Sequence, residues 1–151
     1  MKEVIAFLRA VAPMTDGLQL ALYNTVTQVG FRRHGFVHQG PAPCTNLWFI
    51  EKGLLCCYDQ DQDTGRQYCT WAMEEGNIVT CVNSFDTGFA STESIQAVED
   101  SIVWTIDRPQ LERLTAGYPE FLYIRLRLTE HYHVHGRKMD AWRQKAARAV
   151  L

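Results

Sequence analysis

Hydrophobic positions follow a helical period at both ends of the chain and a strand period between them. At the N-terminus the helical period covers residues 3–11 and stops at Pro13, which cannot continue a helix. Thr15 is a good N-cap residue, and the apolar positions after it predict a second helix that runs to about Val29. The chain is therefore expected to open with two short helices.

Between Phe31 and Ile106, short β-branched and aromatic runs are separated by turn residues such as Gly40 and Gly53. This pattern is typical of a β-sandwich or a β-roll. The predicted strands are residues 46–50, 54–58, 68–73, 94–98 and 102–106, with another beginning at Ile78. The polar segment 59–65 is predicted to be the tip of a hairpin, since it ends in turn-forming residues.

After Ile106 the period becomes helical again, first in a short helix through Leu111 and Leu114 and then in a long helix opened by Pro119. A spacing of four and three residues along the long helix marks a coiled-coil type of seam. Its members are Phe121, Arg125, Leu128, Tyr132, His135, Met139, Trp142, Ala146 and Ala149. Such a helix would reach roughly 48 Å at ~1.5 Å per residue, which is more than one small domain covers. We therefore predict a homodimer with a seam that includes Leu128, Tyr132, His135, Met139 and Trp142.

Composition narrows the class of protein. A chain of 151 residues with 46% hydrophobic and 21% charged residues fits one domain, with the roll over 1–118 and the long helix over 119–151. Its formal net charge of −2 gives no global positive field that would attract nucleic acid or acidic lipid. The apolar run near the N-terminus is too short for a signal peptide, and no segment approaches the ~20 apolar residues of a membrane span. A cytoplasmic protein without membrane contact is expected.

Six short segments, in their order and spacing, resemble the effector domain of the Crp/Fnr family. They are residues 36–40, 47–53, 75–79, 95–101, 111–114 and 118–121. The resemblance covers almost the whole chain, and the segment 95–101 especially resembles divergent Crp/Fnr proteins of the Bacteroidetes type. It implies a mainly β fold with flanking helices: a double-stranded β-helix or jelly-roll-like β-roll of the cyclic-nucleotide-binding type with a long C-terminal helix. It also implies a sensor of a transcription regulator, which binds DNA only through a helix-turn-helix domain that no segment of these residues fits.

The family's phosphate-binding cassette is the segment that, in cAMP-binding members, holds the ribose and the cyclic phosphate with a Gly-Glu pair and an arginine. Counting from Gly76 places these positions on Thr80-Cys81 and on Ser91-Thr92, so the glutamate and the arginine are both absent. No Lys or Arg occurs between Arg66 and Arg108 to replace them. Tight binding of cAMP or cGMP is therefore not expected, because the charged partners of the ligand are lost.

The resemblance nevertheless implies a ligand pocket for a small-molecule effector that the sequence does not identify. Its cassette residues are Thr80, Cys81, Asn83, Ser91 and Thr92. The long helix would add a contact with the pocket and the partner subunit at Tyr132, Gly136 and Arg137.

Histidines and cysteines are the candidate metal-binding or catalytic residues of the chain. His131 and His135 share a helical face at a spacing that zinc can bridge, but no third ligand follows at a helical spacing. His34 and His38 could belong to a metal-binding roll of the cupin type, yet the required HxH pattern occurs only in the predicted helix. The sequence therefore predicts no metal site and no cofactor.

Cys44, Cys56, Cys57, Cys69 and Cys81 contain no CxxC pair, and neighbours such as Cys56 and Cys57 point to opposite faces of a strand. They are interpreted as free thiols of a reducing compartment. A thiol switch at Cys81, at the start of a short helix, is the alternative that stays open.

Two functions remain, and neither is enzymatic. The leading one is a sensor or effector domain of a Crp/Fnr-type transcription regulator, with a ligand other than cAMP. The alternative is a degenerate β-roll that acts as a dimerisation or protein-interaction module with no small-molecule ligand.

Overall fold

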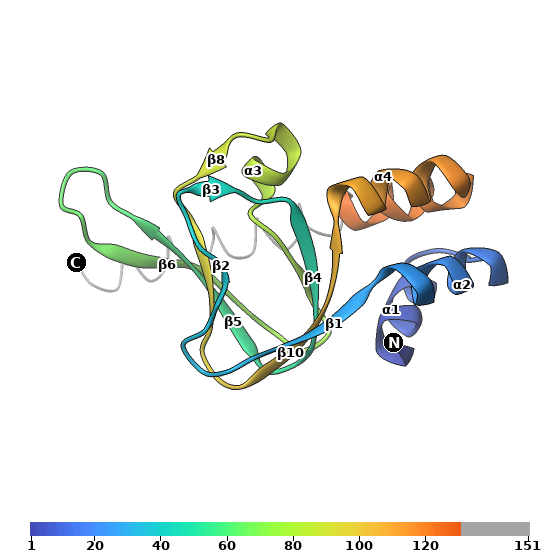
Figure 1. Ribbon diagram of the computed structural model, residues 1–151, viewed down its shortest axis with the longest axis horizontal. Coiled ribbons are helices and arrows are strands. Elements are labelled where there is room, and N and C mark those ends of the chain that lie inside the picture. The colour runs from blue at the N-terminus through green and yellow to red at the C-terminus, as the bar shows by residue number, and fades with distance from the viewer. Residues whose placement is uncertain (131–151) are drawn as a thin grey trace.

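Two four-stranded antiparallel sheets enclose a β-roll, and helices gather at one end of it (Figure 1). The computed structural model describes residues 1–130, apart from the side chain of Asn83. The first sheet has the order β1 (Thr27–Phe31), β10 (Ser101–Asp107), β4 (Asn46–Lys52), β7 (Ile78–Val79). The second has the order β2 (Phe36–His38), β9 (Ser94–Ala97), β5 (Leu54–Gln60), β6 (Gln67–Glu74). The short strands β3 (Ala42–Pro43) and β8 (Ala90–Ser91) pair beside them.

The fold class expected from the sequence is confirmed. A turn at Gly53 explains how the chain passes from one sheet to the other. Strands β4 and β5 are consecutive in the chain but lie in different sheets, with Gly53 between them at φ 108°. A positive φ of this size suits glycine, because other residues place a Cβ against their own backbone there. The polar tip between β5 and β6 is also present, and Asp61 closes it by accepting from the backbone N–H groups of Asp63 and Thr64 at 2.8 Å.

The helices are α1 (Lys2–Val11), α2 (Asp16–Thr25), α3 (Val82–Thr87) and α4 (Arg108–Gly117), and residues 119–130 are helical as well. Thr15 caps α2, because its Oγ1 accepts from the Leu18 N–H at 3.3 Å. The prediction that this helix reaches Val29 was wrong. The chain leaves the helix after Thr25 because residues 27–31 pair with β10, where β-branched Val29 lies opposite Val103.

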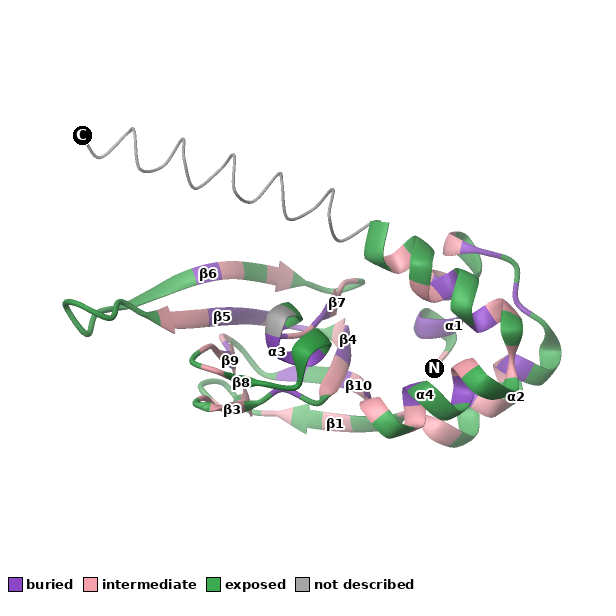
Figure 2. Cartoon of the chain, turned by 90° about the horizontal axis from the view of Figure 1, so that it is seen from above, coloured by how far each residue is buried: buried purple, intermediate pink, exposed green. Residues whose placement is uncertain are grey.

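Buried side chains form two clusters, one at each end of the molecule (Figure 2). The helical cluster joins α1, α2, α4 and residues 119–130 to the ends of β4 and β10, with Leu18 and Ile124 fully buried. The roll cluster fills the space between the sheets with residues such as Ile50, Leu55 and Val103. Within residues 1–130, no helix is long and apolar enough to cross a membrane.

Only the first part of the predicted long helix falls within the described residues. There Phe121 and Ile124 are buried in the helical cluster, and Leu128 packs against its edge. The beginning of the predicted seam therefore faces the chain's own helices, while Leu122 and Leu126 are exposed. The remaining predicted contacts, Tyr132, His135, Gly136, Arg137, Met139 and Trp142, lie outside the described residues.

Candidate functional site

The cassette runs from β7 through α3 to β8, and α3 and β8 lie together with β3 along one side of the roll (Figure 1). Cys81 is the N-cap residue of α3, and its side chain is 1% exposed. Gly88 ends the helix in the left-handed region at φ 77°, and its N–H bonds to the Ser84 carbonyl at 2.8 Å. The Ser84 hydroxyl accepts from the Cys44 N–H at 2.7 Å, which fastens α3 to the segment after β3.

A surface pocket of about 300 Å³ opens beside α3 and β8. Ser91 and Thr92, two of the predicted ligand residues, line it together with Asp59 and Glu93. Thr80 and Cys81 do not line it, since the Thr80 hydroxyl donates to the Asn46 carbonyl at 2.9 Å and Cys81 is buried.

The predicted ligand residues thus belong to two places, an outer pocket and the interior of the roll. Asn83 lies in α3, and its side chain is outside the described part of the structure.

Carboxylates and hydroxyls give the surface pocket its polarity. The Thr92 hydroxyl donates to Asp59 Oδ1 at 2.7 Å, so the last cassette residue is bound to an acid of β5. Among the described residues, no Lys or Arg lines the pocket. A phosphate placed here would meet two carboxylates, and like charges at about 4 Å repel by a few kcal/mol even near a protein surface. The surface pocket is therefore acidic, with Asp59 and Glu93 in its lining.

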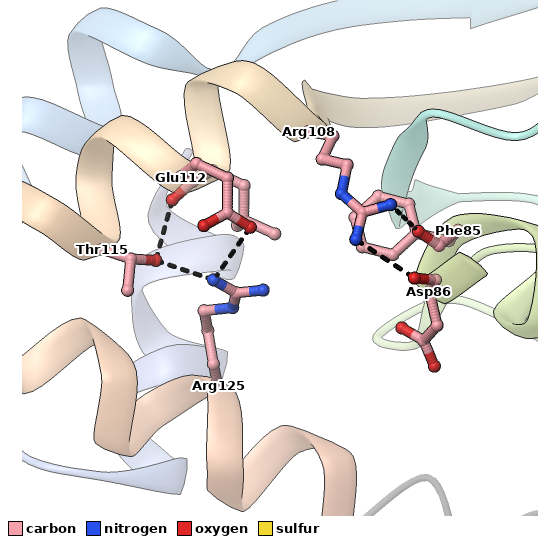
Figure 3. Close-up of polar contacts among 7 residues, drawn as sticks. Phe85, Asp86, Arg108, Glu112, Thr115 and Arg125 are labelled. Atoms are coloured by element: carbon pink, nitrogen blue, oxygen red, sulfur yellow. Dashed lines mark hydrogen bonds and ion pairs between the residues drawn. The ribbon is translucent and has the colours of Figure 1, made fainter. Parts of the chain in front are cut away.

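The guanidinium of Arg108, the first residue of α4, lies close to the cassette but turns its donors to the backbone (Figure 3). It donates to the Phe85 carbonyl and, at 3.3 Å, to the Asp86 carbonyl, both in α3. Its central carbon also lies 5.4 Å from the centre of the Phe85 ring, within cation–π range. Arg108 therefore fastens α3 to the helical end of the molecule and does not supply the missing phosphate ligand.

Three thiols and an imidazole converge inside the roll, beneath the cassette. The ligand atoms of His38, Cys44 and Cys81 all lie within 4.8 Å of one another, as do those of Cys57, Cys81 and Glu93. Cys44, Cys57 and Cys81 are at most 2% exposed. His38 Nε2 is buried and has no hydrogen-bond partner among the described residues. This convergence places two overlapping groups of potential metal ligands around Cys81.

Hydrogen bonding between the thiols shifts the pKa values of Cys44 and Cys81 in opposite directions. The hydrogen bond from Cys81 lowers the pKa of Cys44 to about 5, against the opposing effect of burial. The same contact, a second one with Cys57 and burial together raise the pKa of Cys81. Cys44 is accordingly the more acidic thiol of the pair and Cys81 the less acidic one.

This cluster was not predicted from the sequence. His34 and His38 are close in the sequence but diverge in the structure: His34 lies in a turn at φ 70°, while His38 ends β2. Cys56 and Cys57 are neighbours in β5, and only Cys57 belongs to the interior of the roll. Asp59 and Glu93 were also missed, because they lie outside the counted cassette, Asp59 in β5 and Glu93 between β8 and β9.

Comparisons with known proteins agree with the architecture. The sequence profile of the cyclic nucleotide-binding domain matches residues 31–118, which is more than half of the chain. A search of curated proteins finds no match.

A solved cyclic nucleotide-binding domain from Methylobacillus flagellatus superposes with a TM-score of 0.79 at 16% identity, covering 91% of this chain and 79% of that one. The sensor domain of the transcriptional regulator DNR from Pseudomonas aeruginosa gives 0.67 at 15% identity, covering 85% of each chain. The catabolite activator protein of Thermus thermophilus gives 0.68 at 14% identity, covering 89% of this chain and 61% of that one. At these identities the likeness establishes the fold.

Proposed function

The chain belongs to the cyclic nucleotide-binding domain family, and from this premise we propose that it is a sensor domain of Crp/Fnr-type regulation whose effector is not a cyclic nucleotide. Its similarity to a regulator's sensor domain supports the sensing role. We propose no catalytic activity for it. The buried free cysteines fit a cytoplasmic location, since a reducing compartment keeps such thiols reduced.

The polarity of the surface pocket is the observation that carries this proposal. Where cAMP-binding members place an arginine, this chain has Ser91, and the pocket presents Asp59 and Glu93. The nearby guanidinium of Arg108 is bonded to carbonyls of α3. An anionic ligand would therefore lose its charge-assisted bonds and gain repulsion.

Thermal unfolding with millimolar cAMP or cGMP tests the proposal, and no change in Tm is expected. A ligand at 100 times its Kd stabilises by ~2.7 kcal/mol, which would raise the Tm by several degrees in a domain of this size. A micromolar Kd for cAMP by calorimetry would contradict the proposal.

A variant tests the electrostatic reason directly. Ser91→Arg combined with Glu93→Gln adds a cation at the family's arginine position and removes a carboxylate. Its affinity for cAMP should exceed that of the wild type. If this variant binds no more tightly, charge is not what keeps the nucleotide out.

The second candidate function is a dimerisation module that binds no small molecule. The exposed side chains of Leu122, Tyr123 and Leu126 on the helix of residues 119–130 favour it, because a partner would cover them. A thermal-shift screen of small metabolites separates the two. Stabilising compounds whose effect is lost on altering Ser91 or Thr92 support the sensor, and a screen without any supports the module.

A further inference from the structure

The interior of the roll holds a set of side chains that the surface pocket does not use. His38 comes from the end of β2, Cys44 follows β3, and Cys81 caps α3. Three separate elements thus bring one imidazole and two thiols together, with their ligand atoms within 4.8 Å of one another. We propose that these three residues, the His–Cys trio, bind a thiophilic metal ion of the zinc type inside the roll.

The distances need only a small contraction to fit zinc. Tetrahedral zinc has Zn–S bonds of about 2.3 Å and Zn–N bonds of about 2.0–2.1 Å, so its ligand atoms lie roughly 3.5–3.8 Å apart. The trio lies within 4.8 Å, and its residues sit at element ends and not in the middle of paired strands. Rotations of side chains can bring the atoms to bonding distance around one ion.

The unpaired nitrogen of His38 is an independent observation. Nε2 is buried and has no hydrogen-bond partner among the described residues, an arrangement that is rare for a ring nitrogen in a protein interior. A metal ion would bind its lone pair and remove that deficit. Two thiolates would also balance the charge of a divalent ion, so the completed site would enter the apolar roll without net charge.

The chemistry of the donors selects the class of metal. Thiolate and imidazole ligands favour zinc and similar soft or borderline ions, whereas magnesium and calcium prefer oxygen. Cys57 and Glu93 form a second group with Cys81, whose ligand atoms also lie within 4.8 Å of one another. Glu93 also lines the surface pocket, so this second group connects the buried thiols with the pocket.

Metal titration of the reduced, EDTA-treated chain tests the site. Zinc competed against a chromophoric chelator should bind with one equivalent at a submicromolar Kd. Cobalt should give the near-ultraviolet thiolate-to-cobalt charge-transfer band together with tetrahedral d–d bands. That band requires thiolates, so binding by His131, His133 or His135 cannot produce it. A reduced wild type that lacks the band overturns the proposal.

Matched variants locate the ligands. Cys81→Ser should weaken zinc binding at least 100-fold and abolish the cobalt band, and Cys44→Ser or His38→Gln should weaken binding at least tenfold. Cys56→Ser is the control, because Cys56 lies on the same strand as Cys57 but outside the roll cluster. It should bind like the wild type. Equal binding by Cys81→Ser and Cys56→Ser would overturn the assignment, and the wild-type cobalt spectrum decides the question if a variant fails to fold. The assignment rests on the side chains of the trio and does not depend on the proposed sensing role.

Discussion

The hydroxyl of Thr15 joins two helices at the helical end of the molecule. Thr15 Oγ1 accepts from the Leu18 N–H at 3.3 Å and donates to the Glu120 carboxylate. One side chain thereby caps α2 and fastens it to the helix of residues 119–130. The bond from Thr15 also lowers the pKa of Glu120 from its ordinary value.

Replacing Thr15 tests the contribution of its hydroxyl to stability. Thr15→Ala should lower the free energy of unfolding by about 1 kcal/mol, the usual cost of losing an N-cap, whereas Thr15→Ser keeps the hydroxyl and should stay near wild type. Urea unfolding measures both.

The same substitution has a pH dependence. Glu120 has a lowered pKa when folded, so its contribution is present above its unfolded pKa and is lost as pH falls through the folded value. The difference between Thr15→Ala and wild type should therefore narrow in acid. An unchanged difference between pH 7 and pH 3 would contradict the role of the carboxylate.

At the residue scale, the missing arginine of the cassette was easier to predict than the His–Cys trio. The loss of the cassette arginine is visible in the sequence, because Ser91 stands at a countable distance from Gly76. The His–Cys trio is not visible, because its contacts join residues of three elements and leave no short-range spacing. Local patterns report local geometry, and this group exists only after the roll has closed.

Among the elements, the turn between β4 and β5 depends most strictly on one residue. A Cβ on Gly53 would lie 2.2 Å from Ser101 Oγ and 2.8 Å from Ser101 Cα. Ser101 is 2% exposed and cannot move aside freely. Gly76, in the turn before β7, has a similar φ of 83°, but a Cβ there would meet nothing within 4 Å.

These two glycines form a matched pair for mutation. Gly76→Ala should cost about 1–2 kcal/mol, the penalty of a left-handed backbone. Gly53→Ala carries the same penalty plus the clash and should cost about 3 kcal/mol or more. The midpoints of urea unfolding give the comparison. Equal losses in the two variants would show that Ser101 does not confine this turn.

The boundaries of most elements follow turn residues in the sequence. The exception is the end of α2, which is set by the pairing of the following residues with a distant strand. The strands from β4 to β6 lie within two residues of their predicted bounds, because turn glycines separate them, and α4 contains the predicted Leu111 and Leu114. The end of α2 was misplaced because residues 27–31 are compatible with either state. Their partners in β10 are 70 to 78 positions away, and it is this pairing that makes them a strand.

For the molecule as a whole, the helix of residues 119–130 has one buried face and one exposed face. Phe121 and Ile124 are buried in the helical cluster, while Leu126 is 55% exposed beside the exposed Leu122. A second copy of the chain is the partner that the predicted homodimer requires. Its contact surface would begin on this outer face.

Light scattering tests that arrangement. The wild type at ~100 μM should have the mass of a dimer, a concentration at which even a weak symmetric pair is populated. Leu126→Glu should give a folded monomer, since the change touches an exposed side chain and not the core. Leu20→Glu, at an equally exposed leucine of α2, should leave the mass unchanged. A monomeric wild type, or loss of the dimer in both variants, would contradict the prediction.

Arg108 gives the molecule a thermodynamic connection between its two ends. It holds α3 from the first turn of α4, and Arg125 joins α4 to the next helix by bonding to Glu112 and to Thr115 at 3.0 Å (Figure 3). A ligand that displaced α3 would have to break the first of these contacts, so its binding energy would depend on how firmly the helices are held. Linkage is reciprocal: whatever braces the outer helix, a second subunit included, would change the affinity of the roll by the same factor.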